Sequence, residues 1–213
     1  MVWDELEFGW QMAFSKAWDA FCSGTIPVGA VIINKASELV SMGQNMIYVE
    51  KADYPAIFGS SLAHAEINAI VKLNREEHPN IRSYTLYTTT EPCILCFGAI
   101  VMGNIRHFKY AARDGYAGAA QYNEHSDYVK SKNITIEGPH EQLEAVQITL
   151  ATYYELQNAL PNHENIIAKM VLDCPQGVEA GRELFSKGEL RQFVDSSGSV
   201  AKVFDVICKR LNA

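Results

Sequence analysis

Two cysteines separated by two residues, Cys93 and Cys96, follow a run of β-branched and aromatic residues. That run, residues 84–90, is typical of a buried strand, and Pro92 would end it, because proline fits a strand end or a helix start better than the middle of either. The apolar residues 94–102 then predict a short helix buried on most sides. Cysteines three apart in a first helical turn are neighbours, so both sulfurs can reach one metal ion.

A C-x-x-C pair alone is compatible with four interpretations. It can be a redox dithiol, half of a four-ligand structural zinc site, part of a catalytic zinc site, or two unrelated buried cysteines. His64 and Glu66 favour the catalytic zinc site, because residues 63–73 have the apolar spacing of a helix with His64 near its start. One histidine and two cysteines leave the fourth tetrahedral position to water. Glu66 is then better placed beside the metal than on it.

The order H-x-E followed by P-C-x-x-C is a signature of zinc nucleobase deaminases. With it, the chain resembles the cytidine-deaminase-like superfamily, and more closely the branch that includes tRNA adenosine deaminases and guanine deaminases. The resemblance covers residues 1–114 and thins beyond them. It rests on residues 27–32, Asn45, 63–66, 85–87, 91–93 with Cys96, 98–99 and 111–114.

The resemblance implies a hydrolytic deaminase that holds one Zn²⁺ per chain. In this chemistry zinc activates a water molecule, a carboxylate moves protons, and an exocyclic amine is replaced by a carbonyl group as ammonia leaves. The site residues that it implies are the zinc ligands His64, Cys93 and Cys96, the catalytic Glu66, and the substrate contacts Asn45, Gly29 and Ala30. A homodimer is also expected.

Predicted strands and helices alternate, which indicates a layered α/β fold. We expect a three-layer α/β/α sandwich with a mixed sheet of about five strands. Helices are expected at residues 4–21, 63–73 and 94–102, and strands at 28–33, 39–42, 84–90, 105–110 and 134–136. The chain is expected to form a single domain, residues 1–213, with a deaminase core at 1–138 and a helical C-terminal extension at 139–213.

Several residues near the expected site allow more than one interpretation. A strand glycine such as Gly29 marks a bulge or lets a ligand approach the backbone. A loop asparagine such as Asn45 most often forms a turn, although the resemblance makes it a substrate contact. The aromatic loop at 46–62 can be a pocket wall, a lid or a contact with a neighbouring subunit. Residues 115–131 follow a strand whose end should lie near the pocket, so they can contribute to it.

Charge bears on the class of substrate. The formal net charge is −7, and residues 1–80 carry five basic residues against ten acidic ones. Such a surface repels phosphate backbones, so a small base or nucleoside is expected rather than a nucleic acid, with guanine, adenine or their nucleosides favoured by the resemblance. The alternatives are a tRNA-specific adenosine deaminase and a cytosine or deoxycytidylate deaminase. A structural zinc or redox module is the non-enzymatic alternative.

The start of the chain has neither the basic flank nor the apolar run of a secretion signal, and no segment reads as a transmembrane helix. Five cysteines suit a reducing compartment. A cytoplasmic location without a membrane partner is therefore expected.

Overall fold

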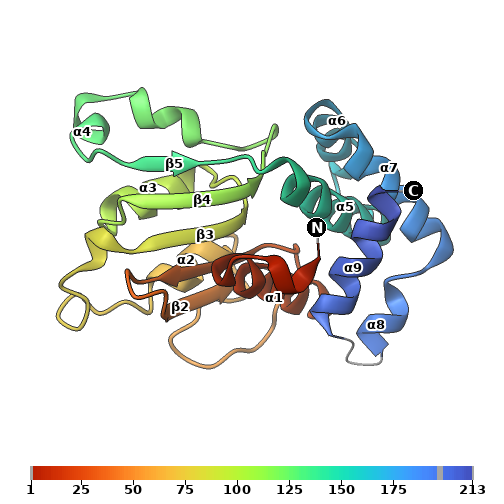
Figure 1. The fold of residues 1–213 in the computed structure, drawn as a ribbon, viewed down its shortest axis with the longest axis horizontal. Helices are drawn as coiled ribbons and strands as arrows, with labels where there is room; N and C mark the ends of the chain where they lie inside the picture. The colour runs from red at the N-terminus through yellow and green to blue at the C-terminus, as the bar shows by residue number, and fades with distance from the viewer. Residues whose placement is uncertain (1, 196–198, 213) are drawn as a thin grey trace.

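The computed structural model describes residues 2–195 and 199–212. Its five strands form one mixed sheet in the order β2-β1-β3-β4-β5 (Figure 1). The strands are β1 (Gly29–Ile33), β2 (Leu39–Gln44), β3 (Thr85–Thr90), β4 (His107–Ala112) and β5 (Thr135–Glu137). β1 pairs antiparallel with β2 and β3, whereas β3, β4 and β5 run parallel to one another. The expected mixed five-stranded sheet is confirmed.

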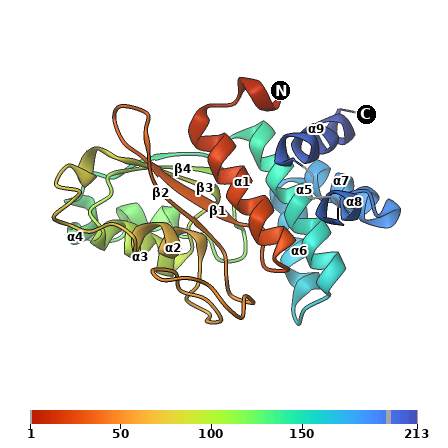
Figure 2. The ribbon, with the colours of Figure 1, turned by 90° about the horizontal axis from the view of Figure 1, so that it is seen from below.

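Helices cover both faces of the sheet. Figure 2 shows α1 (Phe8–Cys22) on one side and α2 (Ala65–Ile70) with α3 (Ile94–Met102) on the other. Successive strand residues point to opposite faces, so β1 contributes to two separate cores. Val31 packs in the cluster that contains α1, and Ile32 packs in the cluster that contains α2 and α3. This double burial explains why β1 is an uninterrupted apolar run.

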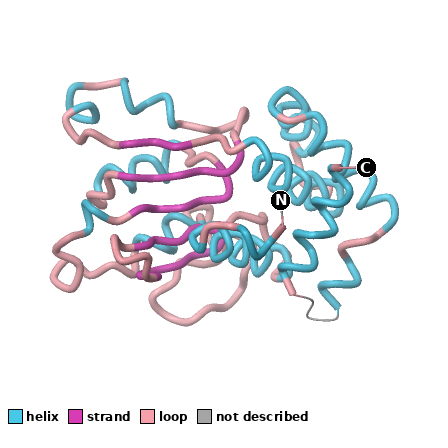
Figure 3. Tube along the Cα trace, in the orientation of Figure 1, coloured by secondary structure: helices cyan, strands magenta, loops and turns pink. Residues whose placement is uncertain are grey.

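The C-terminal part of the chain is helical, as expected, and lies beside the sheet (Figures 1 and 3). Its helices are α5 (Glu141–Asn158), α6 (His163–Asp173), α7 (Pro175–Lys187), α8 (Arg191–Asp195) and α9 (Val200–Leu211). The sequence did not predict α8. No helix of the described residues is long and apolar enough to cross a membrane.

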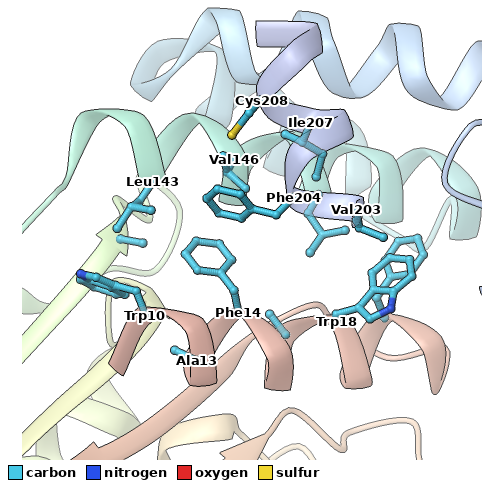
Figure 4. Packing of buried hydrophobic residues seen from close by; sticks show 14 of the residues in the cluster. Trp10, Ala13, Phe14, Trp18, Leu143, Val146, Val203, Phe204, Ile207 and Cys208 are labelled. Carbon is cyan, nitrogen blue, oxygen red and sulfur yellow. The ribbon is translucent and has the colours of Figure 1, made fainter. Parts of the chain in front are cut away.

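α1 joins the sheet to this helical region through two differently composed faces. Small residues, Ala13 and Ala17, allow close contact with β1 at Gly29. Aromatic residues fill the wider space on the other face, where Phe14 lies opposite Phe204 of α9 with ring centroids 5.6 Å apart (Figure 4). Residues of α1, α5, α7 and α9 therefore belong to one hydrophobic cluster.

The first metal-site helix is shorter than its sequence pattern predicts. α2 ends at Ile70 instead of continuing to residue 73, and the apolar Val71, which follows it, is 44% exposed. Asn74 begins the following turn, where its side-chain oxygen accepts a hydrogen bond from the backbone N–H of Glu76. Such a bond competes with helical bonding and favours the turn.

Short elements complete the connections. They are the 3₁₀ helices η1 (Trp3–Glu5), η2 (Ile81–Ser83) and η3 (Ala120–Glu124) and the short helix α4 (Asp127–Lys130).

Candidate metal centre and substrate pocket

The N-termini of α2 and α3 bring the three predicted ligands together. His64 is the residue before α2, Cys93 is the residue before α3, and Cys96 lies in the first turn of α3. Cys93 therefore precedes the helix rather than lying within its first turn. Pro92 and the end of β3 fix where α3 begins, because proline is compatible with a helix start and not with the middle of a strand.

The spacing of the three ligand atoms suits zinc. Nδ1 of His64 lies 3.6 Å from Sγ of Cys93 and 3.4 Å from Sγ of Cys96. Zinc–sulfur bonds of about 2.3 Å and a zinc–nitrogen bond of about 2.0 Å at a tetrahedral angle place these atoms about 3.5 Å apart. Among the described residues, no further histidine, cysteine or acidic side chain joins these three as a fourth ligand. The set therefore fits a zinc ion with one open position.

The two cysteine ligands differ in how easily they ionise. Hydrogen bonds from Cys96 and His64 lower the pKa of Cys93 to about 4, which favours its thiolate. The hydrogen bond with Cys93 and burial together raise the pKa of Cys96. The lowered pKa favours a thiolate at Cys93, and metal ligation requires Cys96 to give up its proton as well.

Glu66 lies directly beside these ligands and is 3% exposed. Its Oε1 accepts a hydrogen bond from the Thr88 hydroxyl at 3.1 Å, and its Oε2 accepts one from the Cys96 thiol at 3.2 Å. Burial raises the pKa of Glu66 above its usual range. The carboxyl group is therefore fixed in orientation and suited to taking up and releasing a proton.

A cavity of about 210 Å³ opens onto this group of residues. Asn45 lines it and is buried. Its Oδ1 accepts hydrogen bonds from the Thr25 hydroxyl and the Ile47 backbone N–H, at 2.8 and 3.1 Å. No hydrogen bond of Asn45 Nδ2 occurs among the described residues, so the side chain forms a turn through its oxygen and has a donor group left over. Both interpretations of Asn45 are compatible with this arrangement.

Gly29 and Ala30 do not line the cavity. A Cβ at Gly29 would overlap the backbone of α1 at Ala13 and Ala17, so close helix packing accounts for this glycine. Ala30 is buried in the cluster that contains α2 and α3. Ala30 also pairs with Thr88, whose hydroxyl bonds Glu66, so it lies near the metal site, and the predicted substrate contacts of Gly29 and Ala30 stay a prediction.

The sequence left open the roles of two loops, residues 46–62 and 115–131, and they contribute unequally to the cavity. Of residues 46–62 only Ile47 lines it, whereas Tyr48 and Tyr54 are exposed away from it. Residues 115–117 also line it, as the position of the preceding strand suggested.

The far wall of the cavity comes from α5 and α6, which belong to the helical extension whose role the sequence left open. Arg113, just past β4, attaches this wall to the sheet. Its guanidinium donates to both carboxylate oxygens of Glu144 on α5, at 2.8 and 2.9 Å, and to the backbone oxygen of Asp173 on α6 at 2.9 Å. Helical periodicity identified α5 and α6 but carried no signal of which face meets the cavity.

Comparison with known proteins defines the class. Residues 4–112 match the family described as "Cytidine and deoxycytidylate deaminase zinc-binding region". The chain belongs to this family, and it is a zinc-dependent deaminase with His64, Cys93 and Cys96 as its metal ligands. The resemblance stated from the sequence is confirmed.

Among curated relatives, the tRNA-specific adenosine deaminase of Rickettsia felis is 32% identical over 114 residues, which are 53% of this chain and 74% of that protein. The tRNA-specific adenosine deaminase of Haemophilus influenzae is 29% identical over 157 residues, 70% of this chain and 83% of that protein.

Solved structures share the fold at low sequence identity. One, in complex with 2,6-diaminopurine, has a TM-score of 0.54 at 20% identity and covers 71% of this chain and 82% of its own. A diaminohydroxyphosphoribosylaminopyrimidine deaminase and reductase from Thermotoga maritima has a TM-score of 0.52 at 21% identity, covering 73% of this chain and 42% of that one.

Proposed function

We propose that the chain deaminates a small purine base or nucleoside by hydrolysis, leaving a carbonyl group on the ring and releasing ammonia. The observation that carries this proposal is the cavity beside the metal ligands, which α5 and α6 close on the side away from the sheet. Small-molecule sites are concave, mostly apolar and equipped with a few polar groups, and this cavity has that character.

The charges around the cavity support a small substrate. Its lining includes five carboxylic acids and only two basic side chains: Glu66, Glu91, Asp114, Glu155 and Asp173 against Arg113 and Lys169. Arg113 is already paired with Glu144. A phosphate backbone entering here would meet net negative charge without the basic groups that neutralise it.

In the proposed mechanism Glu66 accepts a proton from the attacking water and later delivers protons to the ring nitrogen and the leaving amine. When bound, zinc supplies Lewis-acid activation of that water. Thr88 holds the Glu66 carboxyl group in place through its hydrogen bond to Oε1. Asn45 Nδ2 donates a hydrogen bond to an acceptor atom of the substrate and so orients it.

Deamination of adenosine in tRNA is the second candidate. Both curated relatives described above bear that activity in their names, so sequence similarity supports it better than it supports a small purine. Against it stand the acidic cavity and the wall from α5 and α6, which lies beyond the family match at residue 112. The expected homodimer stays a prediction, as does the division into a core at 1–138 and an extension at 139–213.

A substrate panel decides between the candidates. Ammonia release is measured with zinc-loaded protein and guanine, guanosine, adenine, adenosine, cytosine, cytidine and deoxycytidylate, beside inosine formation in a tRNA with adenosine at its wobble position. We expect turnover of a small purine. Inosine in the tRNA without turnover of small molecules would refute the proposal, and turnover of pyrimidines alone would refute the purine assignment.

A further inference from the structure

Glu155 is a buried carboxylate at the cavity with no partner. It lies on α5, lines the cavity and is 7% exposed. Its Oε2 is fully buried without a hydrogen-bond partner, and the Glu155 side chain makes no hydrogen bond or ion pair with residues 2–195 and 199–212. A buried charge is unfavourable, and burial raises the pKa of Glu155, although the charge of nearby His163 partly offsets this shift. A ligand with hydrogen-bond donors would satisfy this group.

Gln147 fixes where Glu155 lies relative to the metal end of the cavity. Its Nε2 donates to the backbone oxygen of Pro27 at 2.8 Å and to the hydroxyl of Thr90 at 3.2 Å, three residues before the ligand Cys93. Glu155 follows Gln147 by eight residues on the same helix, which is about 12 Å along the helix axis. The carboxylate therefore lies toward the end of the cavity that is remote from the ligands.

The distance between the metal ligands and Glu155 limits which molecules can contact both. A purine whose amine is at the metal site extends its ring along the cavity, and a free base ends well short of a group 12 Å or so further along α5. A nucleoside continues through its ribose. The ribose 2′ and 3′ hydroxyls are adjacent donors, and an ionised carboxylate is an acceptor with two oxygens, so the two groups are complementary. Carboxylates bind ribose hydroxyls in this way in dinucleotide-binding proteins.

We propose that Glu155 accepts hydrogen bonds from the 2′ and 3′ hydroxyls of a ribonucleoside and so selects ribonucleosides over free bases. The inference rests on the small-purine function proposed above and narrows it. On α5 and α6 the cavity is lined by two carboxylates, Glu155 and Asp173, and one basic side chain, Lys169, so net negative charge disfavours a 5′-phosphate.

Binding without turnover tests the inference most directly. Zinc-loaded protein with Glu66→Gln is titrated calorimetrically with adenosine, guanosine, their 2′,3′-dideoxy forms, adenine, guanine and adenosine 5′-monophosphate. The series is repeated with Glu155→Gln added, and with Glu141→Gln added as an exposed control on the same helix. Because hydrogen bonds to charged groups are worth more than neutral ones, Glu155→Gln should weaken binding of one ribonucleoside about 10- to 100-fold and leave its dideoxy form and base unchanged.

The outcomes separate this inference from the proposed function. Equal effects of Glu155→Gln on ribo and dideoxy forms, no binding of any probe, or bases or the monophosphate binding as tightly as ribonucleosides would each overturn it. Comparing a ribonucleoside with its 2′,3′-dideoxy form also tests the inference in protein that keeps Glu155. This part of the test therefore does not require the Glu155→Gln variant to fold. Selectivity through Glu155 without deamination of any small purine would support the inference and refute the proposed function.

Discussion

Replacing Phe204 by alanine tests whether the helical region and the sheet unfold together. Phe204, on α9, is 2% exposed, and its ring centroid lies 5.4 Å from that of Trp3 and 5.6 Å from that of Phe14, both edge to face. Truncation of a buried phenylalanine costs about 3–5 kcal/mol, and each such ring pair contributes about 0.5–1.5 kcal/mol of its own. We therefore expect the free energy of unfolding to fall by about 4 kcal/mol.

That loss is large against a total stability of about 5–15 kcal/mol. The assay is urea unfolding followed by tryptophan fluorescence and by far-ultraviolet circular dichroism. Since Phe204 packs in the cluster that contains α1, both signals should shift together to a lower midpoint. Leu172→Ala, at a site on α6 that is 77% exposed, is the control and should change stability by less than about 0.5 kcal/mol.

A loss below about 1 kcal/mol, or separate transitions for the two signals, would refute this reasoning. Separate transitions would mean that residues 139–213 unfold independently of the sheet despite the shared core.

Three further variants test the metal centre and the packing of the sheet. Cys96→Ala should remove stoichiometric zinc, measured by atomic absorption, and lower the melting temperature, because α2 and α3 lose a shared ligand; full zinc content would contradict the ligand set. Glu66→Ala should keep its zinc while ammonia release falls about 10²–10⁴-fold or more, and unchanged release would remove Glu66 from the mechanism. Gly29→Ala should destabilise by about 1–3 kcal/mol in urea because its methyl group meets the backbone of α1. Gly98→Ala, where nothing lies near the added carbon, is the matched control and should not destabilise.

The metal ligands could be predicted because their signal is local. Cys93 and Cys96 are three residues apart at the start of one helix, and His64 starts another, so short-range geometry places the donors. The strands could be predicted equally well, because their side chains alternate between two buried faces. The reason for a glycine at position 29 could not be predicted. A missing Cβ allows close approach of either a ligand or a helix, and only the position of α1 shows that a helix packs there.

The residues of α5 and α6 that line the cavity could not be chosen from the sequence, for a different reason. α5 is buried on nearly every side from Leu143 to Glu155, because the sheet, α6, α7 and α9 pack against it. Its sequence therefore has no single apolar stripe whose opposite face would indicate the cavity. Contacts such as that between Arg113 and Glu144 join residues far apart in the sequence and emerge only when the chain is folded.

The cavity draws on several stretches of the chain: the ligands and Glu66 come from one, residues 64–96, and the opposite wall comes from a second, residues 147–173. Mutations can accumulate in the second stretch without touching any group proposed to handle protons or metal. A lineage of such enzymes can thus acquire new substrates by remodelling α5 and α6 while its chemistry is inherited intact. For directed evolution, random libraries confined to the cavity-facing positions of these two helices are the economical place to begin.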